Sequence, residues 1–110
     1  MTDASQQWTT LCQVDEIPSS GGHYVRYDNR SLAVFRSPGG QVHVLDDACP
    51  HAGASLSGGH IDNGCAICPW HGWAFNLPDG KCPDNPQIGV KSHRVQIDNG
   101  QVQVQLSRTL

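Results

Sequence analysis

The chain contains 110 residues, which is enough for one ordinary domain and too few for two. Its formal net charge of −3 argues against a strongly basic surface and therefore against nucleic-acid binding. Twelve glycines, seven prolines and a single methionine disfavour a helical bundle, and a charged fraction of 15% is too low for a coiled coil. We therefore expect a single globular domain.

The N-terminal segment Met1–Gln7 is polar and acidic, unlike a signal peptide or a membrane anchor. The longest strongly apolar stretch, Cys65–Trp70, contains a proline and is far shorter than the ~20 residues of a membrane-spanning helix. We expect a cytoplasmic protein that is not bound to a membrane. In that reducing compartment, five cysteines favour metal binding or catalysis over a disulfide framework.

Short runs of β-branched and aromatic residues predict antiparallel strands in the first half of the chain. These runs are Tyr24–Tyr27, Leu32–Phe35 and Val42–Leu45, and the turn sequences at residues 28–30 and 37–40 separate them. The region from Asp46 to Phe75 is rich in Cys, His, Gly, Pro and Trp instead, which indicates a site built by loops on a β scaffold.

Two more hairpins are predicted further along the chain. Residues 61–67 read as a short hairpin with Asp62-Asn63-Gly64 at its turn, and residues 78–80 and 83–86 mark a late loop. Runs at Val95–Ile97 and Val102–Leu106 flank Asp98-Asn99-Gly100, and valines alternate with glutamines in the second run. Because no amphipathic stretch has helical length, we predict an all-β fold.

Two segments carry the chemistry, Cys49-Pro50-His51 and Cys68-Pro69-Trp70-His71, with 16 residues between them. Each segment offers one thiolate and one imidazole, and a glycine follows each histidine. A mononuclear zinc site usually pairs Cys with Cys and His with His in each segment. Mixed segments suit a dinuclear centre in which one iron takes both cysteines and the other both histidines. A zinc-stabilised interaction module remains an alternative.

The spacing Cys-x-His, 16 residues, Cys-x-x-His resembles the motif of Rieske [2Fe–2S] proteins. The segments CPHAGASLSGG and CPWHGWAFNLPDG resemble soluble low-potential Rieske ferredoxins of ring-hydroxylating dioxygenases and the small subunit of nitrite reductase. The resemblance covers about residues 8–106. It implies one Rieske domain over residues 1–110, an antiparallel β-sandwich or barrel with a small inserted cluster-binding subdomain at about 46–82. It also implies one [2Fe–2S] cluster held by Cys49, His51, Cys68 and His71.

The sequence departs from the high-potential members of that family. They carry a disulfide between the two cluster loops, and the matching positions here are Ala54 and Trp70. They also place a Ser and a Tyr after the second histidine, where this chain has Trp73 and Phe75. With fewer hydroxyl donors the reduced cluster is less stabilised, and we therefore expect a midpoint potential of roughly −150 to 0 mV.

The other cysteines and histidines receive structural interpretations. We expect Cys65 to be a strand residue, although Cys65-x-x-Cys68 is available as a ligand pair, and Cys12 and Cys82 to be buried or half-buried. Outside the two segments, surface or packing roles are expected for His23, His43, His60 and His93.

Aromatic and proline residues around the segments have expected places as well. Trp70, between two ligands, should be an exposed contact, whereas Trp73 and Phe75 should pack in the core beneath the site. The loop Pro83–Pro86 should lie beside the cluster, as the resemblance implies.

The resemblance implies a one-electron carrier, and we expect a ferredoxin component that passes electrons from a flavin reductase to a terminal oxygenase. The alternative is the small subunit of an assimilatory NAD(P)H nitrite reductase, whose large subunit would be the partner. Nothing in the sequence resembles a substrate pocket, a flavin motif or a catalytic base. We therefore expect an electron-transfer component without a catalytic site of its own.

Overall fold

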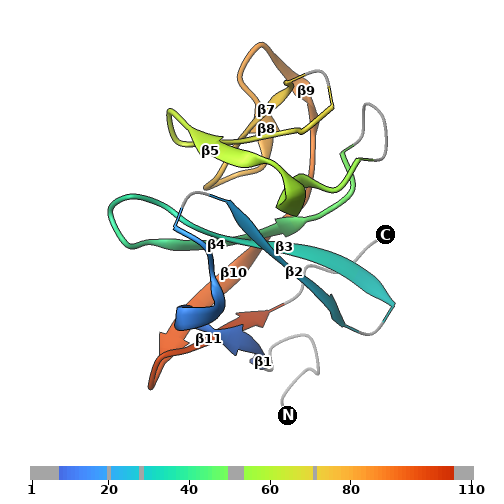
Figure 1. Cartoon of the computed structure of the whole chain (residues 1–110). Helices are drawn as coiled ribbons and strands as arrows, with labels where there is room; N and C mark the ends of the chain where they lie inside the picture. Colours follow the sequence, from blue (N-terminus) through green and yellow to red (C-terminus); the bar gives the residue numbers. More distant parts are fainter. Residues whose placement is uncertain (1–7, 20, 28, 50–53, 71, 106–110) are drawn as a thin grey trace.

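The computed structural model describes residues 8–19, 21–27, 29–49, 54–70 and 72–105, which form antiparallel strands and two 3-10 turns (Figure 1). The strands are β1 (Thr9–Gln13), β2 (Gly22–Tyr27), β3 (Arg30–Arg36), β4 (Val42–Asp46), β5 (His60–Asp62), β6 (Cys65–Ile67), β7 (Ala74–Asn76), β8 (Lys81–Cys82), β9 (Asn85–Gly89), β10 (Ser92–Asp98) and β11 (Gln101–Gln105). The 3-10 turns are η2 (Val14–Glu16) and η3 (Leu56–Gly58).

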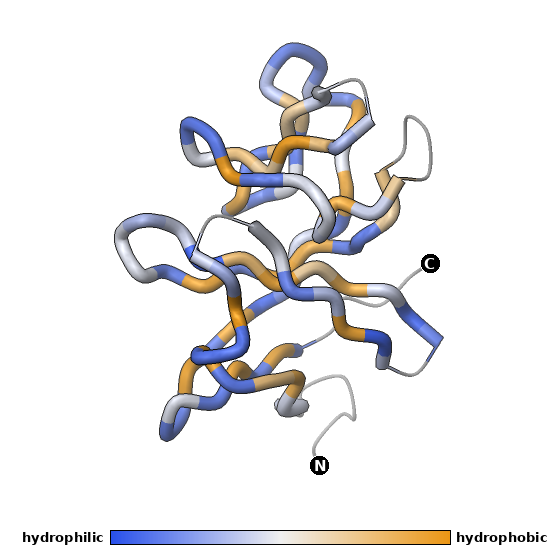
Figure 2. The backbone as a smooth tube through the Cα atoms, in the orientation of Figure 1, coloured by the Kyte–Doolittle hydropathy of each residue, from blue (hydrophilic) through white to orange (hydrophobic). Residues whose placement is uncertain are grey.

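Six strands form the main sheet, in the order β1-β11-β10-β4-β3-β2. The sheet curls until its edge strands β1 and β2 contact each other, which produces a nearly closed barrel. Apolar residues follow the strands, whereas hydrophilic residues gather at the tips of the hairpins (Figure 2). The barrel core consists of Cys12, Ile17, Leu32, Val34, Val44, Val102 and Val104.

A three-stranded sheet, β5-β6-β7, and a two-stranded ribbon, β8-β9, lie against one side of the barrel, above it in Figure 1. A second core joins them to the barrel and includes Ala33, Phe35 and Leu45 from the barrel strands. From the smaller sheets and the loops it includes Cys49, Ala54, Leu56, Ala66, Cys68, Phe75, Leu77 and Cys82.

Strand β3 belongs to both cores. Leu32 and Val34 face the barrel core, and Ala33 and Phe35 face the second core, as the alternation of side chains along a strand requires. All four residues are 0% exposed, which explains the uninterrupted apolar run at this point of the sequence. The strand therefore fixes the position of the smaller sheets relative to the barrel.

The predicted all-β fold is confirmed, and the described part of each predicted strand lies within β2, β3, β4, β10 or β11. The hairpin at residues 61–67 forms as β5 and β6, with Asn63 and Gly64 at positive φ in its turn. Leu106, predicted as the end of the last strand, lies outside the described residues.

The predicted late loop is confirmed at residues 78–80 and 83–84 and is wrong at residues 85–86, which begin strand β9. Strand β9 contains Pro86, which has no amide hydrogen to donate to a neighbouring strand. A proline is tolerated here because β9 pairs with β8 alone and is an edge strand. Strands β1 and β7 were also absent from the prediction.

Within the ranges given above, none of the helical segments has the length and apolar character required to cross a lipid bilayer.

Candidate metal centre

Cys49 begins a loop between β4 and η3. Its backbone amide donates a hydrogen bond to the carbonyl oxygen of Ala54, at 2.8 Å, and Ala48 and Ser55 form a β-bridge just outside this pair. The loop therefore returns to its starting point after six residues. We call residues 49–54 the first loop.

Cys68 begins a second loop of the same kind, between β6 and β7. Its amide donates to the carbonyl oxygen of Trp73 at 2.8 Å, and the Gly72 amide donates to the Cys68 carbonyl oxygen at 3.2 Å. Gly72 has a φ of 71°, in the left-handed region that favours glycine. We call residues 68–73 the second loop. In both loops the backbone amide of the cysteine donates a hydrogen bond to the carbonyl oxygen of the residue five positions later in the chain.

The two cysteines meet in the second core, where each is 1% exposed. Burial raises the pKa of the Cys68 thiol, a hydrogen bond from the Trp70 backbone opposes this, and the hydrogen-bonded Cys49 thiol raises it further. The two cysteines therefore lie in the same buried core, near enough for one thiol to affect the other. A metal ion displaces thiol protons and stabilises adjacent thiolates, so this sulfur pair fits a metal centre.

The two candidate nitrogen ligands, His51 and His71, lie outside the described residues, as do Pro50 and Gly53. Their part in the site stays a prediction. Among the residues that the structure describes, no group of three or more Cys, His, Asp or Glu side chains gathers around a common point.

The aromatic residues lie as predicted. Trp70 is 56% exposed, Phe75 is fully buried, and Trp73 packs partly buried against the second core. A hollow of about 370 Å³ separates the second loop from the β8–β9 hairpin. It is lined by Gly72, Trp73, Ala74, Cys82, Asp84 and Asn85. Part of the 83–86 segment thus lies beside the second loop.

The remaining cysteines are buried, as expected. Cys65 lies in β6 and its thiol donates a hydrogen bond to Oδ1 of Asn76 at 3.3 Å. Cys12 lies in the barrel core, where burial and then the charge of Glu16 raise its pKa to about 11. Cys82 lies in the second core. These packing roles match the interpretation from the sequence.

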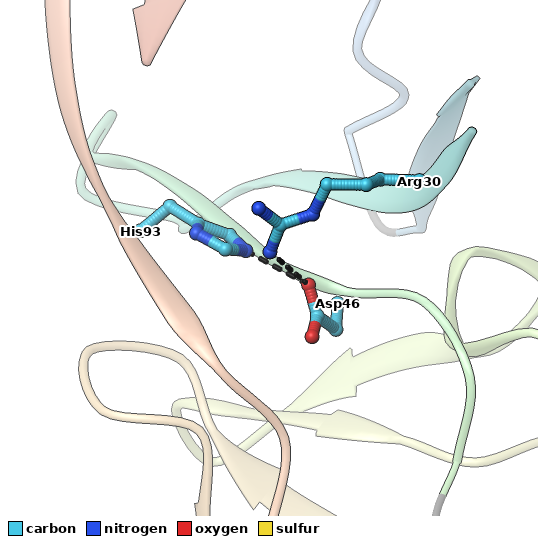
Figure 3. Close-up of polar contacts among 3 residues, drawn as sticks. All are labelled: Arg30, Asp46 and His93. Atoms are coloured by element: carbon cyan, nitrogen blue, oxygen red, sulfur yellow. Dashed lines mark hydrogen bonds and ion pairs between the residues drawn. The ribbon is translucent and has the colours of Figure 1, made fainter. Parts of the chain in front are cut away.

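Three of the other histidines lie at or near the surface. His23 is 3.4 Å from Glu16, His60 is exposed, and His43 is half-buried with a pKa lowered by burial. The fourth, His93, is buried on β10, and its Nε2 lies 2.8 Å from Oδ1 of Asp46 (Figure 3). These four positions agree with surface or packing roles.

Two neighbouring carboxylates at the end of β4 were missed in the sequence analysis. Asp46 faces the barrel, where Arg30 lies 3.6 Å from the oxygen atom that His93 contacts. Asp47 is 4% exposed and faces the first loop, where it accepts hydrogen bonds from Ser55 and Ser57. The Asp-Asp pair directly before Ala48-Cys49 was the signal available in the sequence.

An antiparallel barrel that carries two cysteine-led loops, with both cysteines buried in one core, defines a metal-binding β protein with paired ligand loops. A model of the Rieske [2Fe-2S] domain matches residues 7–103, and the chain therefore belongs to the Rieske [2Fe–2S] family. Its cofactor is one [2Fe–2S] cluster, which decides against the zinc alternative, and its role is electron transfer.

Two solved structures are similar to the chain over nearly its whole length. One is provisionally assigned as the small subunit of an NADH-dependent nitrite reductase from Mycobacterium tuberculosis, with 31% identity and a TM-score of 0.82, covering 94% of this chain and 97% of that one. The other is the Sphingomonas yanoikuyae B1 ferredoxin, with 30% identity and a TM-score of 0.80, covering 92% of this chain and 100% of that one.

Larger curated proteins match as well. Cholesterol 7-desaturase of Hemicentrotus pulcherrimus is 33% identical over 108 residues, which cover 88% of this chain and 23% of that protein. The oxygenase subunit of 3-chlorobenzoate-3,4-dioxygenase from Comamonas testosteroni is 38% identical over 85 residues, 76% of this chain and 19% of that subunit. The chain thus spans less than a quarter of the length of these two relatives.

Proposed function

We propose that this chain is the ferredoxin component of an oxygenase system and carries single electrons from a flavin reductase to a terminal oxygenase. The observation that carries the proposal is the burial of two cysteines in one core, each at the start of a closed loop, in a chain of the Rieske family. Similarity to a ferredoxin over 100% of its length supports a separate carrier.

In this proposal Cys49 and Cys68 bind one iron, and His51 and His71 bind the other. The bound cluster supplies the one-electron chemistry. The chain contributes dry surroundings for the sulfur ligands, through a core that includes Leu56 and Phe75. The exposed Trp70, inside the second loop, offers an apolar contact to a partner, and transient redox complexes need only small interfaces.

The second candidate function is the small subunit of an assimilatory NAD(P)H nitrite reductase. One specific observation favours it: the chain is similar to a solved structure with that provisional assignment, with a TM-score of 0.82 and coverage of 97% of that structure's chain. A stable complex with a large siroheme-bearing subunit would support this alternative. A carrier that forms only transient complexes with a reductase and an oxygenase would support the first proposal.

We also propose the division of the chain into a cluster-binding subdomain at about 46–82 and a basal β domain that provides the rest. The separate sheet β5-β6-β7 supports this division. The proposed compartment is the cytoplasm, because the residues that match the disulfide positions of high-potential Rieske proteins are Ala54 and Trp70.

The first experiment is anaerobic purification of the chain, with assays of iron and acid-labile sulfide and an electron paramagnetic resonance spectrum after reduction by dithionite. We expect two irons and two sulfides per chain and a Rieske-type spectrum. A folded protein that contains neither iron nor sulfide would overturn the proposed function.

Replacement of either candidate nitrogen ligand, His51→Ala or His71→Ala, should prevent assembly of a normal cluster, because imidazole completes the coordination of the second iron. The visible spectrum and the iron content measure this loss. His60→Ala is the matched control, since His60 is exposed and its backbone takes part in the pairing of β5 with β6. If His60→Ala bleached the protein while the other two variants remained coloured, the ligand assignment would be wrong.

A further inference from the structure

The carboxylate of Asp47 is buried at the base of the first loop, with 4% of the residue exposed. One oxygen accepts a hydrogen bond from the Ser57 backbone amide at 2.8 Å, and the other accepts one from the Ser55 hydroxyl at 2.5 Å. Both donors lie on the returning side of the loop. A buried carboxylate is costly without such donors, so these bonds fix its orientation.

The backbone of Asp47 makes two further connections. Its amide donates to the Ser31 carbonyl oxygen on β3 at 3.0 Å, and its own carbonyl oxygen accepts from the Leu56 amide at 2.8 Å. Asp47 therefore binds the barrel on one side and three successive residues of the loop's return, Ser55, Leu56 and Ser57, on the other. This single residue holds both ends of the segment that presents Cys49.

Among the residues that the structure describes, the two loops are held by different contacts. The second loop closes with two backbone hydrogen bonds of its own and a glycine at positive φ. In the first loop the described residues form a hydrogen bond between Cys49 and Ala54, and the outer closure of this loop involves the Asp47 side chain. Removal of that carboxylate would leave the partly buried Ser57 amide without this acceptor.

We propose that Asp47 is a positioning residue of the metal centre, whose buried carboxylate clamps the two ends of the first loop and holds Cys49 against Cys68. The inference rests on the proposed function in one respect, the assignment of Cys49 as a cluster ligand. A ligand held in place before the metal arrives binds more tightly, because less order is lost on binding. The Asp47 carboxylate also places a negative charge two residues before the ligand Cys49, and this charge disfavours the addition of an electron to the cluster.

The test compares Asp47→Ala, Asp47→Asn and Ser55→Ala in the cluster-loaded protein. Asp47→Ala should release iron to a chelator about tenfold faster or more, and Ser55→Ala about threefold faster, since each loses part of the clamp. Asp47→Asn keeps an acceptor for the Ser57 amide and should retain iron nearly as long as the unmodified protein. Asp98→Ala, at the exposed tip of the β10–β11 hairpin, is the matched control and should change nothing.

The reduction equilibrium separates this role from a merely structural one. Asp47→Asn should shift the equilibrium with a reference dye toward the reduced protein by about threefold or more, while its paramagnetic resonance g-values stay unchanged. Iron retention and g-values in Asp47→Ala equal to those of the unmodified protein would overturn the proposal. An unchanged dye equilibrium in Asp47→Asn would overturn the charge effect.

Hydrogen exchange of cluster-free protein distinguishes failure of this inference from failure of the proposed function. The Leu56 and Ser57 amides should lose protection in Asp47→Ala relative to Asp98→Ala, whether or not the chain binds a cluster. If Asp47→Ala does not fold, the same exchange measurement is made on Ser55→Ala and Asp47→Asn. Full protection of the Leu56 and Ser57 amides in Ser55→Ala would then contradict the proposed clamp. A chain without iron but with a working clamp would refute only the proposed function.

Discussion

At the scale of single residues, Asp46 links three strands through its side chain. His93 on β10 and Arg30 on β3 both contact the same carboxylate oxygen at the end of β4 (Figure 3). Burial opposes ionisation of Asp46, but the hydrogen bond and charge of His93, with the charges of Arg30 and Lys91, outweigh it and lower its pKa. The ionised form is therefore favoured in the folded state.

This shift predicts a specific dependence of stability on acid. A carboxyl whose pKa is lower in the folded chain stabilises it above the ordinary value of 3.8, and that contribution is lost as the pH falls through the folded pKa. Asp46→Asn should therefore lower the melting temperature by a few degrees at pH 6, with a smaller difference at pH 3. Thermal unfolding of both proteins at each pH measures this. A difference that grows toward pH 3 would contradict the assignment.

At the scale of elements, three Asp-Asn turns define the hairpins that the sequence predicts. Asn29, Asn63 and Asn99 all adopt positive φ, and glycines at positive φ follow the last two. This pattern matches the primed turns that join twisted antiparallel strands, and it made the hairpins predictable. Strand β7 gave no comparable signal, because its three residues lie between loop segments rich in Trp, Gly and Pro.

In the candidate site, too, residues in short local motifs could be predicted from the sequence, whereas contacts between residues far apart in the sequence could not. Cys49 and Cys68 were predictable because each lies in a short motif with its candidate partner. The contact between His93 and Asp46 joins residues 47 positions apart, and no sequence periodicity relates them. The role proposed for Asp47 depends on η3, whose Leu56 and Ser57 amides donate to Asp47 from the far side of the first loop.

Two adjacent glycines at the end of η3, Gly58 and Gly59, allow a matched test of the packing between this turn and β6. A Cβ atom on Gly59 would lie 1.8 Å from the Ile67 carbonyl oxygen, whereas one on Gly58 would meet only Pro69 at 4.0 Å. Gly59→Ala should therefore destabilise the fold by about 2 kcal/mol or more, because backbone must move to relieve the overlap. Gly58→Ala should be within about 0.5 kcal/mol of the original, and denaturant unfolding measures both. Equal effects would contradict the close approach of η3 to β6.

At the scale of the whole molecule, the environment of the metal centre predicts a low midpoint potential. Trp73 and Phe75 occupy the positions where high-potential Rieske proteins have Ser and Tyr, and neither side chain has a hydroxyl group to donate to the cluster sulfur atoms. With fewer donors the reduced cluster is less stabilised, and we expect a midpoint potential of roughly −150 to 0 mV in a dye-mediated titration at neutral pH. A value above roughly +150 mV would contradict this account of the residues around the cluster.

The double burial of β3 has a practical consequence for engineering. Leu32 and Val34 pack in the barrel core, and Ala33 and Phe35 pack in the second core, so a library that randomises all four would damage both packing environments. A library designed to change the redox partner should instead vary exposed positions such as Trp70 and Asp84. Selection there can alter recognition while the scaffold that carries the electron stays intact.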